Sequence, residues 1–280
     1  IIGTYIAYDY KIVNEFLRVY MLKTESLDTK LIYVIGDSHA LAFQNKLLTL
    51  PDNKINFLPK LLYIRGLSIE NILNGQNLRE EIKNLILQNN LAAENNLPSS
   101  LTNNKNILNE QYATGFGFSN QNILFHCGEL YIRALLKNLI QQNESIELDD
   151  TLKEQIKVTF TKIITLYFNI LNSLATQFHF NISIHDICPP TSNDKDFQSL
   201  NGYLVSKKLR SYAYGLFNDL LEKLSEENPN IFLCKSRDYL EDENGFLKAE
   251  YDFDSCHADM KYASISLERM AVNWLQSRTA

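Results

Sequence analysis

The stretch LIYVIGDSHALAF, residues 31–43, places a serine and a histidine between two apolar runs. A serine hydroxyl in the first turn of a helix lies near unpaired backbone N–H groups, whose partial positive charge stabilises an oxyanion during acyl transfer. Ser38 is therefore a candidate nucleophile. Capping is the commonest use of residues such as Asp37 and Ser38 at the start of a helix, so this stretch alone favours a structural role.

A serine nucleophile needs a general base, and the C-terminal part of the chain offers one. The sequence DSCH at 254–257 places Asp254 three residues before His257. This spacing brings both side chains to one face of a turn or helix start, where the carboxylate can orient the imidazole. Ser38, His257 and Asp254 together predict a Ser-His-Asp triad that performs acyl transfer.

Five short apolar runs alternate with helical patterns and determine where these residues must lie. The predicted strands are 31–35, 60–64, 122–127, 180–185 and 230–234, and the predicted helices are 40–50, 68–73, 129–142, 202–224 and 257–277. A further helical stretch, 148–176, lengthens the third crossover. This alternation predicts an α/β fold with a five-stranded parallel sheet covered on both faces.

Polar residues follow several of the predicted strands directly. Gly66 follows the second strand, Glu129 and Arg133 follow the third, and the pair His185 and Asp186 ends the fourth. Ligands bind at the carboxyl ends of the strands in an open α/β sheet, so we expect these residues to converge there. We expect His185 and Asp186 to belong to a loop that shapes the pocket.

Residues 74–120 interrupt the alternation. They hold an amphipathic segment, LREEIKNLILQ, followed by an Asn-rich run. We interpret them as a helical and Asn-rich insertion between the second and third strands of a single domain that spans 1–280.

Composition excludes several classes of protein. The chain has 280 residues, of which 45% are hydrophobic and 21% charged, and a formal net charge of -6. A globular core is therefore expected, and nucleic acid is not an expected partner because Lys and Arg are not concentrated anywhere. No apolar run approaches the ~20 residues of a membrane span. The first 20 residues lack a basic start and a cleavage site, so we expect a cytoplasmic location.

We expect no cofactor and no metal. The four cysteines are spread without a CxxC pair, and GFG at 115–117 is too short for a dinucleotide fingerprint and precedes a strand. The oligomeric state is not predictable from the sequence.

Four stretches occur in the order of a known set of sequence blocks: GDSH at 36–39, Gly66, GELYIR at 128–133 and DSCH at 254–257. They resemble the blocks of the SGNH (GDSL-like) hydrolase superfamily. The resemblance implies a flavodoxin-like three-layer α/β/α sandwich, with Ser38 as nucleophile, His257 as base and Asp254 as its partner. It also implies that the backbone N–H groups of Ser38 and Gly66 form the oxyanion hole.

The form GDSHA is similar to branches with a histidine after the nucleophile, including SGNH domains attached to polysaccharide O-acyltransferases or acting beside them. This resemblance implies an acyl ester hydrolase or an O-acyltransferase whose partner is an acylated carbohydrate or an acyl donor. His39, Glu129 and Arg133 are then candidate substrate-binding residues. His39 could equally pack beside the sheet, and Glu129 and Arg133 could form an ordinary i,i+4 pair.

The third block departs from the pattern GxND, because Leu130 and Tyr131 stand at its last two positions. Some GDSH relatives carry a GEIDxR form, which GELYIR approaches. Loss of one oxyanion donor costs ~10²–10³ in rate. Two alternatives remain open: another donor such as Arg133 substitutes for the Asn, or the chain is a catalytically weak or inactive domain that binds a glycan or partner within a larger glycan-modifying enzyme.

Overall fold

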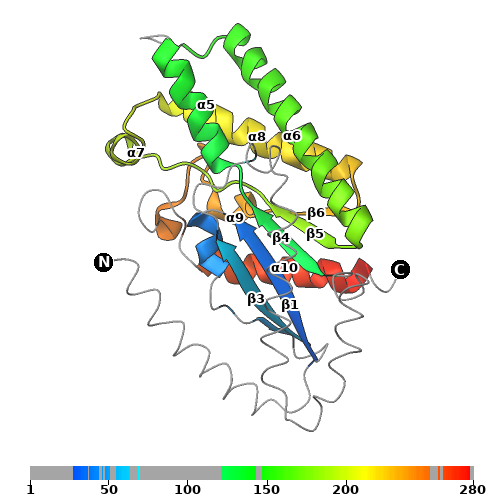
Figure 1. The fold of residues 1–280 in the computed structure, drawn as a ribbon. Helices are drawn as coiled ribbons and strands as arrows, with labels where there is room; N and C mark the ends of the chain where they lie inside the picture. Colours follow the sequence, from blue (N-terminus) through cyan, green and yellow to red (C-terminus); the bar gives the residue numbers. More distant parts are fainter. Residues whose placement is uncertain are drawn as a thin grey trace.

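A six-stranded β-sheet forms the centre of the protein (Figure 1). The computed structural model describes residues 28–36, 38–43, 46, 48–50, 55–63, 69, 121–142, 147–252, 258 and 261–277. The strands are β1 (Asp28–Gly36), β2 (Leu48–Leu50), β3 (Ile55–Tyr63), β4 (Asn122–His126), β5 (Asn181–His185) and β6 (Ile231–Cys234). The α/β class with a parallel sheet is therefore confirmed.

The strand order is β2-β3-β1-β4-β5-β6. All neighbouring strands are parallel except β2, which runs antiparallel to β3 at the edge. Along the chain, the parallel strands thus lie in the order second, first, third, fourth and fifth, which is the doubly wound order of flavodoxin-like sheets. The chain leaves β1 toward β3 on one side and later returns to β4 on the other. The carboxyl end of β1 is the switch point where ligands bind in such sheets.

The predicted helix 40–50 is wrong in its second half. A 3-10 helix, η1, covers Ser38–Phe43, and Leu48–Leu50 then forms β2. Pairing with β3 supplies backbone partners for the Leu-Thr-Leu run, whose β-branched centre favours a strand. The sheet consequently has one more strand than the sequence analysis predicts.

Strand β3 begins at Ile55, five residues before the predicted start at 60, and it contains Pro59. Proline lacks the N–H that a central strand needs for its ladder. β2 pairs only with Ile55 to Phe57, so Pro59 lies beyond the residues that β2 covers. A proline is tolerated in β3 at this position, but its presence explains why the sequence pattern predicts a strand only from residue 60.

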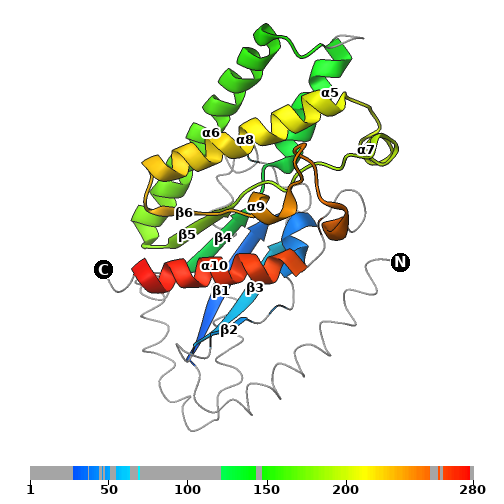
Figure 2. The same cartoon turned by 180° about the vertical axis from the view of Figure 1, so that it is seen from behind.

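Helices cover both faces of the sheet. They are α5 (Glu129–Gln142), α6 (Asp150–Phe178), α7 (Asp194–Asn201), α8 (Lys207–Glu227), α9 (Arg237–Leu240) and α10 (Lys261–Ser277), with a 3-10 turn η4 at Ala249–Tyr251. The bounds of α5 agree with the prediction, whereas α7, α9 and η4 are not predicted. Figure 2 shows α10 lying across the sheet on the side opposite α5 and α6.

Alternation along β1 and β4 divides the core in two. Tyr33 and Ile35 of β1 pack with Phe125 of β4 against α5, α6 and α8. Their neighbours Ile32 and Val34 point the other way and pack against η1 and α10. Because successive strand residues face opposite sides, one apolar run serves both faces of the sheet, which explains why β1 is hydrophobic without interruption.

Two glycines of the sequence motifs have a steric role. A Cβ on Gly36 would lie 2.4 Å from the carbonyl oxygen of His126 and 2.7 Å from Cβ of Ala40. Gly128 has φ 139° and leads the chain from β4 into α5, a backbone conformation that other residues rarely adopt. Both motifs thus owe their glycine to close packing at the carboxyl end of the sheet.

The predicted insertion, 74–120, lies outside the described residues, as does the predicted helix 68–73 apart from Ile69. Within the described part of the chain, no helix has the length and apolarity required to cross a membrane.

Candidate active site

The predicted triad is only partly within the described residues. Ser38 is the first residue of η1 and follows the carboxyl end of β1 by two residues. Asp254, His257 and the predicted oxyanion donor Gly66 lie outside the described residues. The backbone of Ser38 is thus located at the switch point of the sheet, and the triad itself stays a prediction.

The residues on either side of 253–257 show where this segment starts and ends. Asp252 and Ala258 form an antiparallel β-bridge with each other. Ala258 is buried in the same hydrophobic cluster as Ala40 and Phe43 of η1. Helix α10, which begins at Lys261, packs on η1 as well (Figure 2). The C-terminal part of the chain therefore returns to the helix that Ser38 opens.

Three histidines stack in a row across neighbouring strand ends. His39 lies in η1 after β1, His126 ends β4 and His185 ends β5. The ring centroids of His39 and His126 are 5.8 Å apart, and those of His126 and His185 are 4.4 Å apart, with interplanar angles of 4° and 24°. All three side chains are buried. Phe43 presents its ring edgewise to His126 and His185.

Helix α10 binds this histidine row through two residues one turn apart. The Tyr262 hydroxyl donates to the carbonyl oxygen of His39 (3.3 Å) and lies 3.4 Å from Nε2 of His126. Ser266 Oγ lies 2.9 Å from Nε2 of His185 and 2.8 Å from the Tyr239 hydroxyl. Nδ1 of His185 lies 2.8 Å from the carbonyl oxygen of Asp186, which can only accept, so the proton is on Nδ1 and Nε2 accepts from Ser266.

His126 sits in the middle of the row and is surrounded by other rings. Burial lowers its pKa well below the ordinary value, and the neighbouring imidazoles of His185 and His39 lower it further by charge repulsion. His126 is therefore neutral at pH 7, which allows three imidazoles to stack without a build-up of positive charge.

Glu129, the first residue of α5, lies between His39 at the end of the histidine row and the side chains of Arg133 and Tyr214. Its carboxylate accepts from Arg133 Nη1 (3.2 Å) and from the Tyr214 hydroxyl (2.8 Å), and Oε2 lies 3.8 Å from Nε2 of His39. Burial by itself raises the pKa of Glu129, but the hydrogen bond from His39, the charge of Arg133 and the Tyr214 hydroxyl outweigh it, so the pKa is lowered. Burial and the adjacent carboxylate raise the pKa of Tyr214. Glu129 is thus an anion that accepts hydrogen bonds from Arg133 and Tyr214, with the His39 ring nearby.

The three predicted substrate-binding residues line one small cleft. His39, Glu129 and Arg133 form part of its wall, and the other lining residues are Cys188, Pro189, Pro190, Thr191, Phe197, Asn201 and Tyr214. The convergence of the three residues that the sequence analysis predicts is confirmed, although substrate binding is not tested by it. The volume of about 20 Å³ holds about one water molecule. The Arg133 side chain is 22% exposed, against 3% for His39.

Tyr131 belongs to the GELYIR stretch at 128–133, which differs from the GxND pattern, and it does not line this cleft. It packs on the large hydrophobic cluster, where its ring centroid is 6.2 Å from that of Phe160. The helical turn after Gly128 points Glu129 and Arg133 toward the strand ends and Tyr131 toward α6. The block therefore places charged residues at the site and an aromatic residue in the core.

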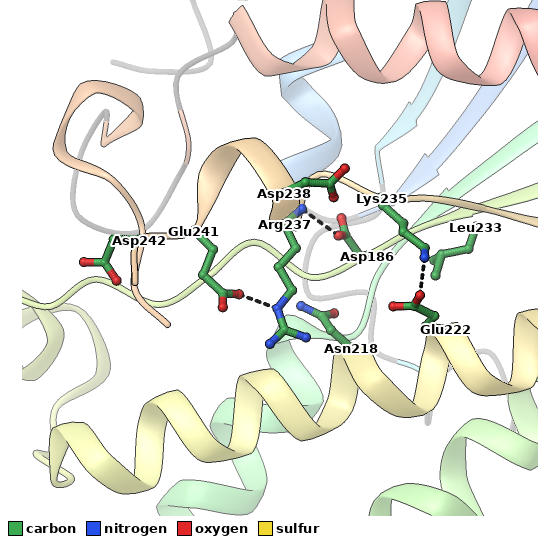
Figure 3. Close-up of a pocket in the computed structure, with 9 residues that line it drawn as sticks. All are labelled: Asp186, Asn218, Glu222, Leu233, Lys235, Arg237, Asp238, Glu241 and Asp242. Carbon is green, nitrogen blue, oxygen red and sulfur yellow. Dashed lines mark hydrogen bonds and ion pairs between the residues drawn. The ribbon is translucent and has the colours of Figure 1, made fainter. Parts of the chain in front are cut away.

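A second cleft, of about 320 Å³, lies at the ends of β5 and β6 beside α8 and α9 (Figure 3). Its wall is highly charged, but the charges pair with one another: Lys235 with Glu222, and Arg237 Nε with Glu241 at 2.6 Å. Figure 3 shows the two pairs joined by dashed lines, with Arg237 and Glu241 one helical turn apart. These charged side chains of the second cleft thus bind one another.

The prediction that His185 and Asp186 belong to a pocket-shaping loop is wrong for His185, which ends β5 inside the sheet. Asp186 does line the second cleft, but its main contacts are structural. It accepts from the N–H and hydroxyl of Ser236 (2.8 and 2.5 Å) and from the N–H of Arg237 (2.9 Å), which starts α9. A buried carboxylate with these donors anchors α9 to β5.

The stacking of the three histidines, and their contacts with Tyr262 and Ser266 of α10, are not predicted from the sequence. A signal was present: β4 reads NILFH and β5 reads NISIH, with the same residue types at both ends. The strands pair in register, so Asn181 donates to Asn122 at one end (2.9 Å) and the two histidines stack at the other.

The comparisons with known proteins find similarity only among solved structures. No family model and no curated protein matches the chain. A protein from Streptococcus pneumonia aligns at 15% identity with a TM-score of 0.47 and covers 96% of this chain and 99% of its own. A GDSL-like lipase from Bacteroides thetaiotaomicron aligns at 12% identity and TM-score 0.45 (93% and 97% covered), and the acetyl xylan esterase AlAXEase at 10% identity and 0.42 (87% and 98% covered). At these values the likeness does not assign the chain to a family or an activity.

Proposed function

We propose that the protein is a serine-dependent acyl transfer enzyme, an ester hydrolase or O-acyltransferase, that acts on short acyl esters of a carbohydrate. Ser38 is the nucleophile, His257 the general base and Asp254 the residue that orients it. The observation that carries the proposal is the position of Ser38: it opens η1 at the switch point of a doubly wound sheet, and Ala258 and α10, which follow the proposed base in the chain, pack on η1.

The reaction follows from these roles. His257 takes the proton of the Ser38 hydroxyl while Ser38 Oγ forms a bond to the ester carbonyl carbon, and the carbonyl oxygen becomes an oxyanion. The oxyanion collapses, the bond to the alcohol breaks, and His257 returns the proton to the leaving alkoxide. Water or a second hydroxyl then attacks the acyl-serine by the same steps, which gives an acid or a new ester.

The cleft that His39, Glu129 and Arg133 line is small. A volume of about 20 Å³ does not accept a long chain, and even an acetyl group requires one lining side chain to move. Arg133 is the most exposed of the three predicted substrate-binding residues and is the side chain that we expect to move. The carbohydrate part of the proposal rests on the resemblance of GDSHA to polysaccharide-modifying branches.

Oxyanion stabilisation in this proposal lacks the usual Asn. The backbone N–H groups of Ser38 and Gly66 supply two donors, and the Arg133 guanidinium, which lines the same cleft as His39, supplies the third. Replacement of Arg133 by Met would then lower kcat by ~10²-fold. Arg133→Lys would recover part of this loss, because a charge remains without the planar fork.

The test is hydrolysis of p-nitrophenyl acetate by the wild type, Ser38→Ala and Ser173→Ala, where Ser173 is exposed on α6. We expect the wild type and Ser173→Ala to be equally active and Ser38→Ala to be inactive. Mass spectrometry after treatment with a fluorophosphonate would show one adduct, on Ser38. Equal activity of wild type and Ser38→Ala would remove Ser38 from the mechanism.

Hydrolysis and transfer differ only in the second step. With p-nitrophenyl acetate as donor and methyl glucoside as acceptor, a hydrolase releases acetate, and a transferase forms acetylated sugar in proportion to acceptor concentration. The ratio of the two products, measured by chromatography, distinguishes them.

The alternative is an inactive domain that binds a glycan or a partner. The core position of Tyr131, where the family pattern has a polar residue, favours it. Absence of both esterase activity and the fluorophosphonate adduct, together with binding of a polysaccharide measured by calorimetry, would support this alternative over an enzyme.

A further inference from the structure

Tyr262 connects the two parts of the chain that carry the proposed nucleophile and base. It lies five residues after His257, and its hydroxyl donates to the carbonyl oxygen of His39, the residue after Ser38. This hydrogen bond joins α10 to η1 directly, so a shift of the Tyr262 hydroxyl changes the distance between these two elements. The side chain is fully buried, where a hydroxyl requires a partner.

The aromatic ring of Tyr262 is held separately from its hydroxyl. It makes edge contacts with Phe43 (centroids 6.0 Å apart) and His185 (5.6 Å apart), and it is tilted against His126 (6.5 Å). Ring packing therefore locates α10 on the histidine row, whereas the hydroxyl binds η1 through the His39 carbonyl oxygen and also lies against Nε2 of His126. Removing only the oxygen separates these two contributions.

We propose that Tyr262 is a positioning residue that holds α10 in register with η1, the element that Ser38 opens. This inference rests on the proposed function for its catalytic consequence. Its structural consequence, the fixed register of α10 on η1, does not depend on activity.

The test compares Tyr262→Phe with Tyr239→Phe. Tyr239 is the matched control because its hydroxyl also bonds to α10, through Ser266 one turn further on, and does not bond to η1. For p-nitrophenyl acetate, we expect Tyr262→Phe to lower kcat by at least ~10-fold with KM unchanged, since a shift of about 1 Å in a catalytic group costs up to ~10²-fold. Tyr239→Phe should keep the wild-type kcat.

Hydrogen exchange gives a second readout that requires no activity. Amides of 38–43 and of the first turn of α10 should exchange about tenfold faster in Tyr262→Phe than in the wild type or Tyr239→Phe. Equal effects of both substitutions on kcat or exchange, or no effect of either, would overturn the inference. An inactive wild type with the expected exchange difference would instead refute the proposed function and leave the register role of Tyr262 supported.

Discussion

Stability below pH 6.5 should depend on His126. Its pKa is lowered in the folded state by burial and then by the rings of His185 and His39. In the unfolded chain a histidine binds a proton near pH 6.5. As the pH falls through that value, the unfolded state takes up a proton that the folded state does not, so the free energy of unfolding decreases.

The size of the effect follows from linkage. Each pH unit between the two pKa values removes about 1.4 kcal/mol per proton. Below pH 6.5 the loss from this one group approaches that limit for each pH unit until the pH reaches the folded-state pKa of His126. The stability that comes from neutral, buried His126 is fully present above pH 6.5 and is lost as the pH falls toward the folded-state pKa.

Other groups in contact with the row titrate too, so a variant must isolate His126. The row ends at two carboxylates: Glu129 lies 3.8 Å from Nε2 of His39, and Asp186 Oδ1 lies 3.2 Å from Nδ1 of His185. His126→Gln removes the central titrating group and leaves both ends in place. The difference in slope between wild type and variant then reports His126 together with its coupling to His185 and His39.

The assay is urea denaturation at several pH values from 7 to 5. We expect the free energy of unfolding of His126→Gln to fall less steeply with decreasing pH than that of the wild type, by up to about 1.4 kcal/mol per pH unit. His179→Asn is the control, because His179 is exposed at the end of α6 in a left-handed conformation that Asn tolerates. It should keep the wild-type slope. Parallel slopes for wild type and His126→Gln would refute the reasoning.

Three further substitutions test the packing around the site, each by urea denaturation. Gly36→Ala should lower the free energy of unfolding by about 3 kcal/mol or prevent folding, because its Cβ would lie 2.4 Å from a carbonyl oxygen of β4. Asp186→Ala should cost about 3–5 kcal/mol, since the buried N–H and hydroxyl of Ser236 lose their acceptor. Phe217→Ala, in the centre of the larger core cluster, should cost about 3–5 kcal/mol, whereas Val158→Ala at an exposed position should change stability by less than about 0.5 kcal/mol.

The sequence predicted those elements whose stability is local or whose pattern is strong. β4, β5 and β6 are short apolar runs bounded by polar residues, and α5 shows a clear helical period from its first residue. α9 was missed because it has four residues and its first backbone N–H donates to a carboxylate 51 positions earlier in the chain, that of Asp186. Contacts between distant segments are invisible to periodicity.

The part of the site that follows from the meeting of parallel strand ends at one edge of the sheet could be predicted from the sequence. His39, Glu129 and Arg133 were brought together because parallel strands end at one edge of the sheet. The histidine row was not, because stacking requires His126 and His185 to lie side by side, which depends on the register of β4 and β5. Register follows from the packing of whole faces and is not encoded in either strand alone.

The position of α10 connects these observations to the chemistry. A nucleophile near the start of the chain and a base near its end must be held together at a fixed distance, and flexible loops alone do this poorly. α10 lies across the ends of β1, β4 and β5, where Tyr262 and Ser266 bind the histidine row. In the proposed function, the buried histidines serve the reaction by holding the helix that follows its base, and protonation of His126, whose pKa burial lowers, would disturb this packing.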